Sequence, residues 1–512
     1  MSDIGQGRTR REVVAGMAVG AAACIVSGAG PAKARPRLSR AQAERVGVDP
    51  AGVVAFIDAV ERTVGGLHGM LLLRRGKVAA EAWWSPYEPR RPHMLFSLSK
   101  SFTSTAVGFA VAEGKLALDA EVAACFPESL PARASANLRA MRLRHLLTMT
   151  TGHDEDTTDG ATRDPDGDWV RGFLALPVEH APGSHWVYNT AATYMASAMV
   201  QKVTGSTVRD YLEPRLFRPL GIEGATWEAC PRGISVGGSG LSVRTEDIAR
   251  FGQMLLQRGQ WRGRQIVPAA WVDEAASKQV SNGDDPASDW AQGYGYQFWR
   301  CRHGAYRGEG AFGQCCVVMP AQDAVLAITS GVSDMGAVLN AAWEHLLPAF
   351  GRPAPAGAAD ALKRRVAGLS VPVPAGAAIS DTARAVSGRC IAFESNPDGI
   401  RSATLSWRDG RCRIAMEADA GPMRLDAPHE RWARGTAALR SPRGPVVTVP
   451  VAARGAWTAA DTFTVTLCFV ESPFVQTDAW RFSGGDVTVA RRTNVAFGPT
   501  DLPALSGRLS AA

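Results

Sequence analysis

The sequence predicts an α+β protein in which a domain of mixed helices and strands precedes a β-rich domain. A chain of 512 residues exceeds the size of one average core. Helical periodicity dominates residues 115–230, with strand-like runs on either side, whereas mainly strand-like patterns follow residue 376. The composition, 46% hydrophobic and 21% charged, is ordinary for a globular protein. Two folded units are therefore expected.

Capping and turn residues predict where the first helices and strands of the chain begin and end. Residues 49–63 begin with Asp-Pro and have amphipathic spacing, which predicts a helix. Strand-like runs at 69–74 and 77–84 flank an Arg-Gly pair and predict a β-hairpin. A further helix begins near Ser97, and Gly114 is placed to end it as a left-handed cap.

The centre of the first domain is predicted to be helical before it returns to strands. The expected helices lie at 138–149, 190–204 and 208–216. Thr245 is expected to cap another helix that has acidic residues in its first turn. Two apolar runs, 314–319 and 324–329, flank Pro320 and predict a pair of strands.

The rest of the chain suggests a linker and a second domain. Residues 351–376 contain four prolines among alanines and glycines, which suits a semi-rigid connection. The C-terminal strands are expected at 403–407, 411–417, 462–470, 480–482 and 487–490. The predicted segments are a signal peptide at 1–34, the mixed domain at 35–350, the linker at 351–376 and an antiparallel β-rich domain at 377–512.

The N-terminal residues resemble a twin-arginine export signal. Arg10-Arg11 precede a weakly apolar stretch, and Ala32-Lys33-Ala34 matches an A-x-A cleavage site. We therefore expect a periplasmic or secreted protein with no stable membrane span after processing. The formal charge of +7 falls to +5 without residues 1–34, which hold four basic and two acidic side chains. The remaining charge is spread along the chain, so nucleic-acid binding is not expected.

The most informative motif of the chain is Ser97-Leu98-Ser99-Lys100. One helical turn places residues i and i+3 on the same face, so the Lys100 amine can lie against the Ser97 hydroxyl. This arrangement supplies a nucleophile and its base. A serine in the first turn also lies near the positive end of the helix dipole, which favours an alkoxide-like transition state. Ser97 is therefore the predicted nucleophile.

Two further segments can complete a site for acyl transfer. Tyr188 lies where a loop meets a helix, and it can carry a proton between Ser97 and a leaving group if a nearby cation lowers its pKa. The glycine-rich segment 307–314 leads into a strand. Small residues there allow a substrate backbone to approach, and they leave one N–H to form an oxyanion hole with the N–H of Ser97.

Together these segments resemble the serine β-lactamase/penicillin-binding superfamily, in particular its class C-like esterases, amidases and 6-aminohexanoate-dimer hydrolases. The resemblance covers about residues 45–350 and implies an antiparallel sheet with a helical lobe and a site between them. It implies that Ser97 is the acylated serine and Lys100 the general base. It also implies that Tyr188 is the tyrosine of the Y-x-N element and that Ala311 provides the second oxyanion amide.

Two departures from the family pattern shape the expected substrate. Thr190 stands at the asparagine position of Y-x-N, although the adjacent Asn189 can substitute for it. Gly308 stands where a lysine or histidine usually helps to hold a substrate carboxylate, and Glu309 would oppose such binding. Arg307 can compensate only if its side chain faces the site.

The expected substrate contacts are Asn189, Thr190, Gly308 and Gly310. The sequence thus predicts an exported serine hydrolase that cleaves an amide or ester bond in a small molecule through an acyl-enzyme on Ser97. A β-lactamase or D-Ala-D-Ala carboxypeptidase is one alternative. A binding or scaffold protein that kept the fold is another. The sequence does not indicate an oligomeric state.

No cofactor or metal ion is expected from the motifs. Within the acidic segment 154–168, residues 164–168 resemble the start of a calcium loop, but the twelfth position is Ala175 rather than Glu. A solvated loop, bordering the substrate cleft, explains this segment better. His145, His153 and His185 are too scattered to form a recognisable metal motif.

Overall fold

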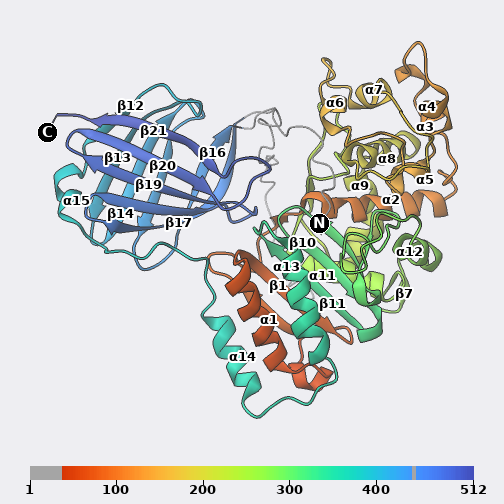
Figure 1. Ribbon diagram of the computed structural model, residues 1–512, viewed down its shortest axis with the longest axis horizontal. Helices are drawn as coiled ribbons and strands as arrows, with labels where there is room; N and C mark the ends of the chain where they lie inside the picture. The colour runs from red at the N-terminus through yellow and green to blue at the C-terminus, as the bar shows by residue number, and fades with distance from the viewer. Residues whose placement is uncertain (1–36, 441–445, 512) are drawn as a thin grey trace, which may run out of the picture. The chain divides into compact units, whose positions relative to one another are not determined.

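The computed structural model describes residues 37–440 and 446–511, so the predicted signal peptide lies outside the described residues. The chain divides into two compact units, with the boundary between Val371 and Pro372 (Figure 1). Each unit has its own hydrophobic core. The first unit mixes helices with an antiparallel sheet and the second consists almost entirely of strands, which confirms the predicted fold class.

A six-stranded antiparallel sheet forms the centre of the first unit, in the order β2-β1-β11-β10-β9-β8. Its strands are β1 (Leu67–Arg74), β2 (Lys77–Trp83), β8 (Trp299–Arg300), β9 (Tyr306–Gly310), β10 (Gln314–Met319) and β11 (Ala324–Ser330). The hairpin β1–β2 and the pair β10–β11 confirm the predicted strands. Arg75 and Gly76 both have positive φ at the hairpin turn, which agrees with the right-handed twist of the strands.

Helices pack on this sheet and on one another. The long helices are α1 (Pro50–Thr63), α2 (Ser99–Ala112), α11 (Thr245–Leu256) and α12 (Ala269–Ala276), followed by α13 (Met335–Ala341) and α14 (Ala358–Ala367). Helix α11 contacts β1, β10 and β11, whereas α1 contacts α13 and α14 (Figure 1). The Asp49 carboxylate accepts a hydrogen bond from the Ala51 N–H, which confirms the predicted start of α1.

The other α-helices of the first unit form a lobe beside α2, and all of them except α8 are short. They are α3 (Val122–Cys125), α4 (Ala136–Ala140), α5 (Leu143–Leu147), α6 (Thr158–Thr162), α7 (Trp169–Leu174), α8 (Thr190–Thr204), α9 (Val208–Leu212) and α10 (Arg218–Leu220). Helix α8 has the predicted bounds, and Gly205 ends it with φ of 70°. The single helix predicted at 138–149 is wrong, because Met141 and Arg142 are extended and separate α4 from α5.

Two other expectations differ from the structure. Thr245 is the first residue of α11 and not its cap, because Arg244 takes the cap position and donates its N–H to the Asp247 carboxylate at 3.3 Å. Residues 351–376 were expected to form a linker, but helix α14 occupies ten of them and packs on α1. Its Arg365 pairs with the Asp58 carboxylate at 2.7 Å, which ties this helix to the first unit.

Small sheets complete the first unit. One contains β3 (His93–Met94), β5 (Leu241–Val243) and β4 (Thr226–Trp227), and the other contains β6 (Gln260–Trp261) and β7 (Arg264–Gln265). The three-stranded sheet matters for the site, because it brings the chain just before β5 against the start of α2. The Leu241 N–H, for example, donates to the Ser99 hydroxyl at 3.1 Å.

The second unit is a ten-stranded antiparallel sheet with one short helix, α15 (Asp381–Val386). Its strands are β12 (Cys390–Phe393), β13 (Ile400–Arg408), β14 (Arg411–Ala418), β15 (Met423–Pro428), β16 (Ala433–Arg440), β17 (Val446–Ala459), β18 (Thr462–Cys468), β19 (Val475–Ser483), β20 (Asp486–Thr493) and β21 (Asp501–Leu509). Buried and exposed residues alternate along β14, so one face of the sheet forms the core. Trp457 and Trp480 are buried in that core. None of the described helices in either unit is long and apolar enough to span a membrane.

Candidate active site

Ser97 and Lys100 meet at the start of α2, as the sequence predicts. Ser97 lies in a single 3₁₀ turn, Phe96–Leu98, that continues directly into α2. The Lys100 Nζ donates a hydrogen bond to the Ser97 Oγ at 3.0 Å. The side chains therefore share one face of the turn, and the amine is in position to remove the hydroxyl proton.

Neutral oxygen atoms surround the Lys100 amine. It donates to the Gly238 carbonyl at 2.8 Å and to the Thr190 hydroxyl at 3.2 Å, and the residue is 1% exposed. Burial lowers the pKa of Lys100 to about 7, although the negative charge of Asp156 opposes this shift. A substantial fraction of the amine is thus uncharged near neutral pH and can act as a base.

Tyr188 lies beside this pair in the loop that leads into α8. The Lys100 Nζ is 4.8 Å from the centre of the Tyr188 ring, which stacks on Trp299 with 5.4 Å between ring centroids. Burial raises the pKa of Tyr188, which outweighs the opposing effect of its hydrogen bond with Ser97. The charge of Arg307 lowers this pKa, but the effect of burial is larger, so the condition of a lowered pKa is not met. A protonated phenol suits an acid rather than a base.

Asn189 and Thr190 have different roles from the predicted substrate contacts. Asn189 is fully buried, and its Oδ1 caps α8 by accepting from the Ala192 N–H at 3.2 Å. Its side chain therefore does not substitute for the missing asparagine of the motif. Thr190 instead occupies that place, because its hydroxyl is the one that accepts from Lys100.

Asp156 belongs to the site, although the sequence did not identify it. Its Oδ2 accepts a hydrogen bond from the Thr190 N–H at 3.0 Å, and its Oδ1 accepts from the Thr158 N–H at 2.9 Å. Its negative charge favours the charged form of Lys100. The only signal in the sequence was its position in an acidic segment near the predicted cleft.

The glycines of β9 face the nucleophile segment. A Cβ on Gly308 would lie 2.5 Å from Leu98 Cδ1 and from Ser101 Oγ, and one on Gly310 would lie 2.0 Å from the Leu95 carbonyl oxygen. Only glycine lets the strand approach so closely. The Cα atoms of these glycines pack against residues 95–101, and their predicted contact with substrate through the backbone stays a prediction.

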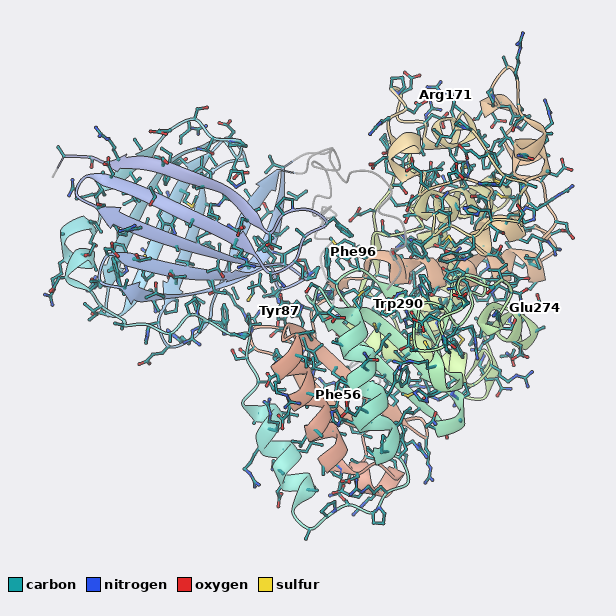
Figure 2. The ribbon with its side chains drawn as sticks, in the orientation of Figure 1. Phe56, Tyr87, Phe96, Arg171, Glu274 and Trp290 are labelled. Atoms are coloured by element: carbon teal, nitrogen blue, oxygen red, sulfur yellow. The ribbon has the colours of Figure 1, made fainter. Side chains whose placement is uncertain are left out.

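Arg307 alternates to the opposite face of β9, where it is fully buried. It pairs with Glu309 through two contacts of 3.0 and 3.1 Å, and Trp290 (labelled in Figure 2) donates its Nε1–H to the same carboxylate at 2.9 Å. Burial opposes the charge of Arg307, but the attraction of Glu309 outweighs it and raises the pKa of Arg307. The guanidinium is thus committed to an internal ion pair and does not replace the missing cation.

Ala311 follows the last residue of β9 in the turn to β10. Within the described parts of the chain, neither the Ala311 N–H nor the Ser97 N–H has a protein acceptor. Both backbone groups therefore remain available for an external oxygen, as an oxyanion hole requires. Phe96 (Figure 2), which precedes Ser97, packs edge-on against Phe312, which follows Ala311, with 5.4 Å between ring centroids.

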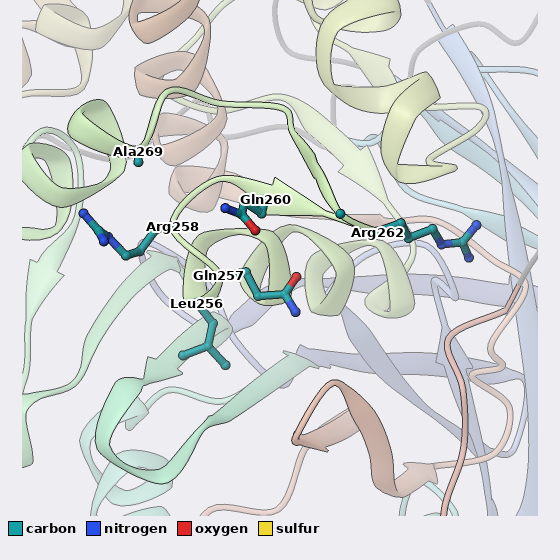
Figure 3. A pocket seen from close by; sticks show the side chains of 7 residues that line it. Leu256, Gln257, Arg258, Gln260, Arg262 and Ala269 are labelled. Atoms are coloured by element: carbon teal, nitrogen blue, oxygen red, sulfur yellow. The ribbon is translucent and has the colours of Figure 1, made fainter.

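A cavity of about 420 Å³ lies elsewhere, at the C-terminal end of α11 and the β6–β7 hairpin (Figure 3). It is lined by Leu256, Gln257, Arg258, Gln260, Arg262, Gly263 and Ala269. None of these residues belongs to the Ser97 site. The acidic segment 164–168 is likewise accounted for without an ion, because Arg171 binds the Asp164 carboxylate through two hydrogen bonds of 2.8 Å.

Comparison with known proteins agrees with this geometry. The family model described as Beta-lactamase matches residues 56–347, which is more than half of the chain. The chain belongs to the beta-lactamase family. This membership confirms the resemblance inferred from the Ser97, Tyr188 and Gly308 segments, and it places the chain among hydrolases of the serine type.

Relatives within this family have different names. A 6-aminohexanoate-dimer hydrolase from Paenarthrobacter ureafaciens is 26% identical over 317 residues, which cover 56% of this chain and 80% of that protein. The esterase EstB from Burkholderia gladioli is 31% identical over 205 residues, and the match spans 34% of this chain and about half (52%) of that relative.

A solved structure also shares the fold. It comes from Bacillus anthracis and is named as a 6-aminohexanoate-dimer hydrolase, with a TM-score of 0.50 and 19% identity over 58% of this chain and 83% of that one. The likeness at this identity concerns the fold alone.

Proposed function

We propose that this protein is an exported serine hydrolase that cleaves an ester or amide bond through an acyl-enzyme on Ser97. One observation carries the proposal. The Lys100 amine lies 3.0 Å from the Ser97 hydroxyl, and burial lowers the pKa of that amine to about 7. Burying a lysine without a carboxylate in contact costs stability, and groups with pKa values shifted in this way cluster at functional sites.

The acylation step follows from this pair. Neutral Lys100 takes the proton of Ser97 while the Ser97 Oγ attacks the substrate carbonyl carbon. The electrons of the C=O bond move to oxygen, and the N–H groups of Ser97 and Ala311 stabilise the resulting oxyanion. When the C=O bond re-forms, the leaving group departs with the proton of the Tyr188 hydroxyl, and the Lys100 ammonium returns a proton to Tyr188.

Deacylation repeats the same steps with water as the nucleophile. Lys100 accepts a proton from the attacking water, and the tetrahedral intermediate collapses to release the carboxylic acid. Ser97 then regains its proton from the Lys100 ammonium. The raised pKa of Tyr188 supports the assignment of Lys100 as the base in both steps and of Tyr188 as the acid in acylation.

The scissile bond is proposed to belong to an ester or a small amide rather than a β-lactam. Gly308 offers no cation for a substrate carboxylate, and Arg307 is held by Glu309 on the other face of β9. The names of the two relatives, an esterase and a 6-aminohexanoate-dimer hydrolase, are consistent with this choice. Substrate contacts by the backbone near Gly308 and Gly310 form part of the proposal.

A fluorophosphonate probe tests the nucleophile directly. The wild-type protein should be labelled on Ser97, and Ser97→Ala should abolish labelling. Ser104→Ala is the matched control, because its buried hydroxyl lies on the same helix and has no hydrogen-bond partner in the described residues. Labelling elsewhere, or none in the folded wild-type protein, contradicts the proposal and favours a non-catalytic binding or scaffold protein.

A substrate panel then separates the candidate reactions. Nitrophenyl esters and short amide oligomers should be hydrolysed with kcat/KM well above that for nitrocefin. Efficient turnover of nitrocefin or of a D-Ala-D-Ala peptide would instead favour a β-lactamase or a carboxypeptidase. Each substrate should be measured with Ser97→Ala to exclude activity from contaminants.

Export is a separate part of the proposal. Residues 1–34 contain the paired arginines and the A-x-A site, and we propose that they direct the folded protein to the periplasm or beyond it. N-terminal sequencing of the exported protein should begin at residue 35. Arg10→Lys combined with Arg11→Lys should keep the unprocessed chain in the cytoplasm, and normal processing of this variant would contradict twin-arginine export.

A further inference from the structure

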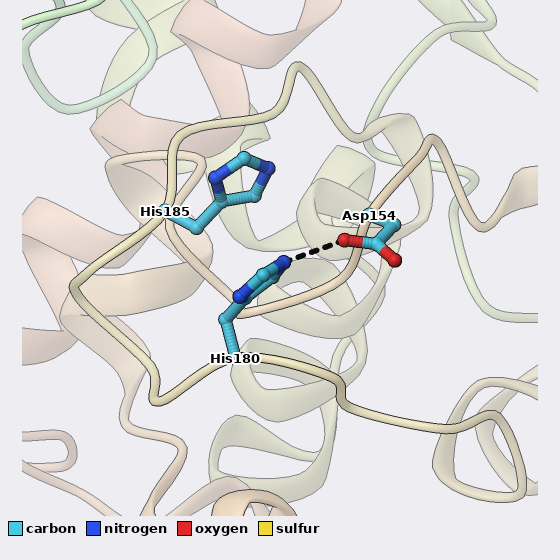
Figure 4. A group of neighbouring side chains, drawn as sticks. All are labelled: Asp154, His180 and His185. Atoms are coloured by element: carbon cyan, nitrogen blue, oxygen red, sulfur yellow. Dashed lines mark hydrogen bonds and ion pairs between the residues drawn. The ribbon is translucent and has the colours of Figure 1, made fainter.

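Two histidines and an aspartate come together at a place that the proposed reaction does not use. Asp154, His180 and His185 lie in the loops that precede α6 and α8, and their side chains point toward one another (Figure 4). One ligand atom from each lies within 4.8 Å of the others. The His180 Nε2 is 2.5 Å from the Asp154 Oδ1, and the rings of His180 and His185 have centroids 4.4 Å apart.

The backbone holds these two loops against each other. The His180 N–H donates to the Gly152 carbonyl at 2.8 Å, and the Gly183 N–H donates to the Thr150 carbonyl at the same distance. Gly152 has φ of 92°, and a Cβ there would lie 2.3 Å from the His180 carbonyl oxygen. The approach of the loops thus depends on glycine and is not an accidental surface contact.

The chemistry of the three side chains points to a particular class of ligand. Two imidazole nitrogens and one carboxylate oxygen are typical ligands of zinc and related divalent transition ions. The Glu179 carboxylate, which accepts from the Asp154 N–H at 3.3 Å, adds negative charge beside the group. Asp154 is exposed and the histidines are half-buried, so an ion can enter from solvent.

We propose that Asp154, His180 and His185 bind one divalent transition-metal ion of the zinc type, which joins the loop before α6 to the loop before α8. Ligands held by metal bonds of about 2.0–2.2 Å lie farther apart than the 2.5 Å between His180 Nε2 and Asp154 Oδ1, so the three side chains have to rearrange around an ion. Side-chain rotation in the loops supplies that movement. Water completes the coordination, because no fourth side chain lies in the group.

A bound ion would fix the positions of the two loops that lie next to the Ser97 site. Asp156 follows Asp154 by two residues and binds the Thr190 N–H, while Tyr188 follows His185 by three residues. An ion that fixes both loops therefore also fixes the segments that carry these groups. The proposal concerns binding and stability, and it does not depend on whether Ser97 is a nucleophile.

The full chain, freed of metal by a chelator, provides the test. Titration with Zn²⁺ in a calorimeter should show one ion per chain, and Zn²⁺ should raise the Tm. His180→Ala and His185→Ala should each weaken binding at least about tenfold and remove the rise in Tm, with a smaller loss for Asp154→Asn. His303→Ala is the matched control, because His303 is an exposed histidine outside the group.

The identity of the ligands needs a second readout, because thiols also bind zinc. All eight cysteines among the described residues are free, and Cys390 is exposed. Co²⁺ bound at the proposed site should give visible d–d bands without a thiolate charge-transfer band. A thiolate band that disappears in Cys390→Ser, binding that persists in both histidine variants, or no binding by the folded wild-type chain would overturn the proposal.

Discussion

Two of the buried basic side chains in the first unit, Lys100 and Arg307, differ in whether a carboxylate contacts them. The Lys100 amine donates to neutral oxygens of Ser97, Thr190 and Gly238, and its pKa falls to about 7. Arg307, on the far face of β9, shares two hydrogen bonds with Glu309, and its pKa rises. Burial acts against the charge of both, but only Arg307 has a partner that outweighs it.

This difference indicates which of the two buried basic groups can take part in catalysis. A compensated guanidinium remains charged at all accessible pH values, so it fixes the structure around it. An uncompensated amine loses its proton near neutral pH and becomes a base. The comparison makes opposite predictions for the two sites: changes at Lys100 should affect reaction rate, whereas changes at Arg307 and Glu309 should affect the stability of the fold.

Lys100→Met gives the largest expected effect. Removing the base should lower kcat/KM for an activated ester by roughly 10³-fold, within the usual range for general-base catalysis. The free energy of unfolding should not fall, because the buried amine is no longer desolvated and methionine fills most of its volume. Kinetic assays measure the fall in kcat/KM, and thermal unfolding measures the stability. Unchanged activity in a folded variant would remove Lys100 from the mechanism.

Glu309→Gln should have the opposite effect and lower the stability of the fold while it leaves the reaction rate almost unchanged. It leaves the Arg307 charge buried without its partner, and breaking such a pair typically costs about 3–5 kcal/mol of stability. Below the Tm of the variant, the rate of Ser97 acylation should change little. Chemical denaturation of the variant and labelling with the fluorophosphonate probe provide the two measurements.

A double variant separates the pair from the packing around it. Arg307→Met combined with Glu309→Gln removes both charges, so its stability should lie well above that of Glu309→Gln alone. If the double variant is no more stable than the single one, the loss does not come from an uncompensated charge. The proposed difference between Lys100, which has no carboxylate partner, and Arg307, which has one, would then be wrong.

The parts of the site that the sequence predicted depend on local spacing. Ser97 and Lys100 are three residues apart on a helix, and the period of two along β9 correctly places Arg307 opposite Gly308. Asp156 and the Gly238 carbonyl reach Lys100 through long-range packing that no local pattern encodes. The contact of Thr190 with Lys100 has the same origin, whereas Asn189 is held locally as the N-cap of α8.

The same distinction holds for the rest of the fold. Helices α1 and α8 carry their own caps, so their bounds could be predicted. Helix α14 lies in a stretch with proline and glycine at both ends, and it is held by packing on α1 and by Arg365. His180 and Asp154 are distant in sequence and meet only because backbone hydrogen bonds join their loops.

Thr190→Val should have an intermediate effect on the Lys100 site. It removes one of the three oxygens that accept from the amine but keeps the shape of the side chain. We expect up to about a tenfold fall in kcat/KM, the usual consequence of losing one hydrogen bond. Thr193→Val, one turn further along α8, removes a hydroxyl that binds Gln297 instead and should not affect acylation. Equal losses in both variants would indicate a general disturbance of the helix.

Asp156→Asn should have the smallest effect, and its sign is specific. The Asp156 charge favours the protonated form of Lys100, so removing it lowers the pKa of the amine further. Acylation requires the neutral amine, and the rising limb of the pH–rate profile, near pH 7 in the wild type, should therefore move to lower pH by a fraction of one unit. Because Asp156 is exposed, the shift should shrink as salt is added. Asp159 is an exposed carboxylate in the same segment, and Asp159→Asn should not move the profile. A shift to higher pH in Asp156→Asn would contradict the view that the Asp156 charge opposes the effect of burial on the Lys100 pKa.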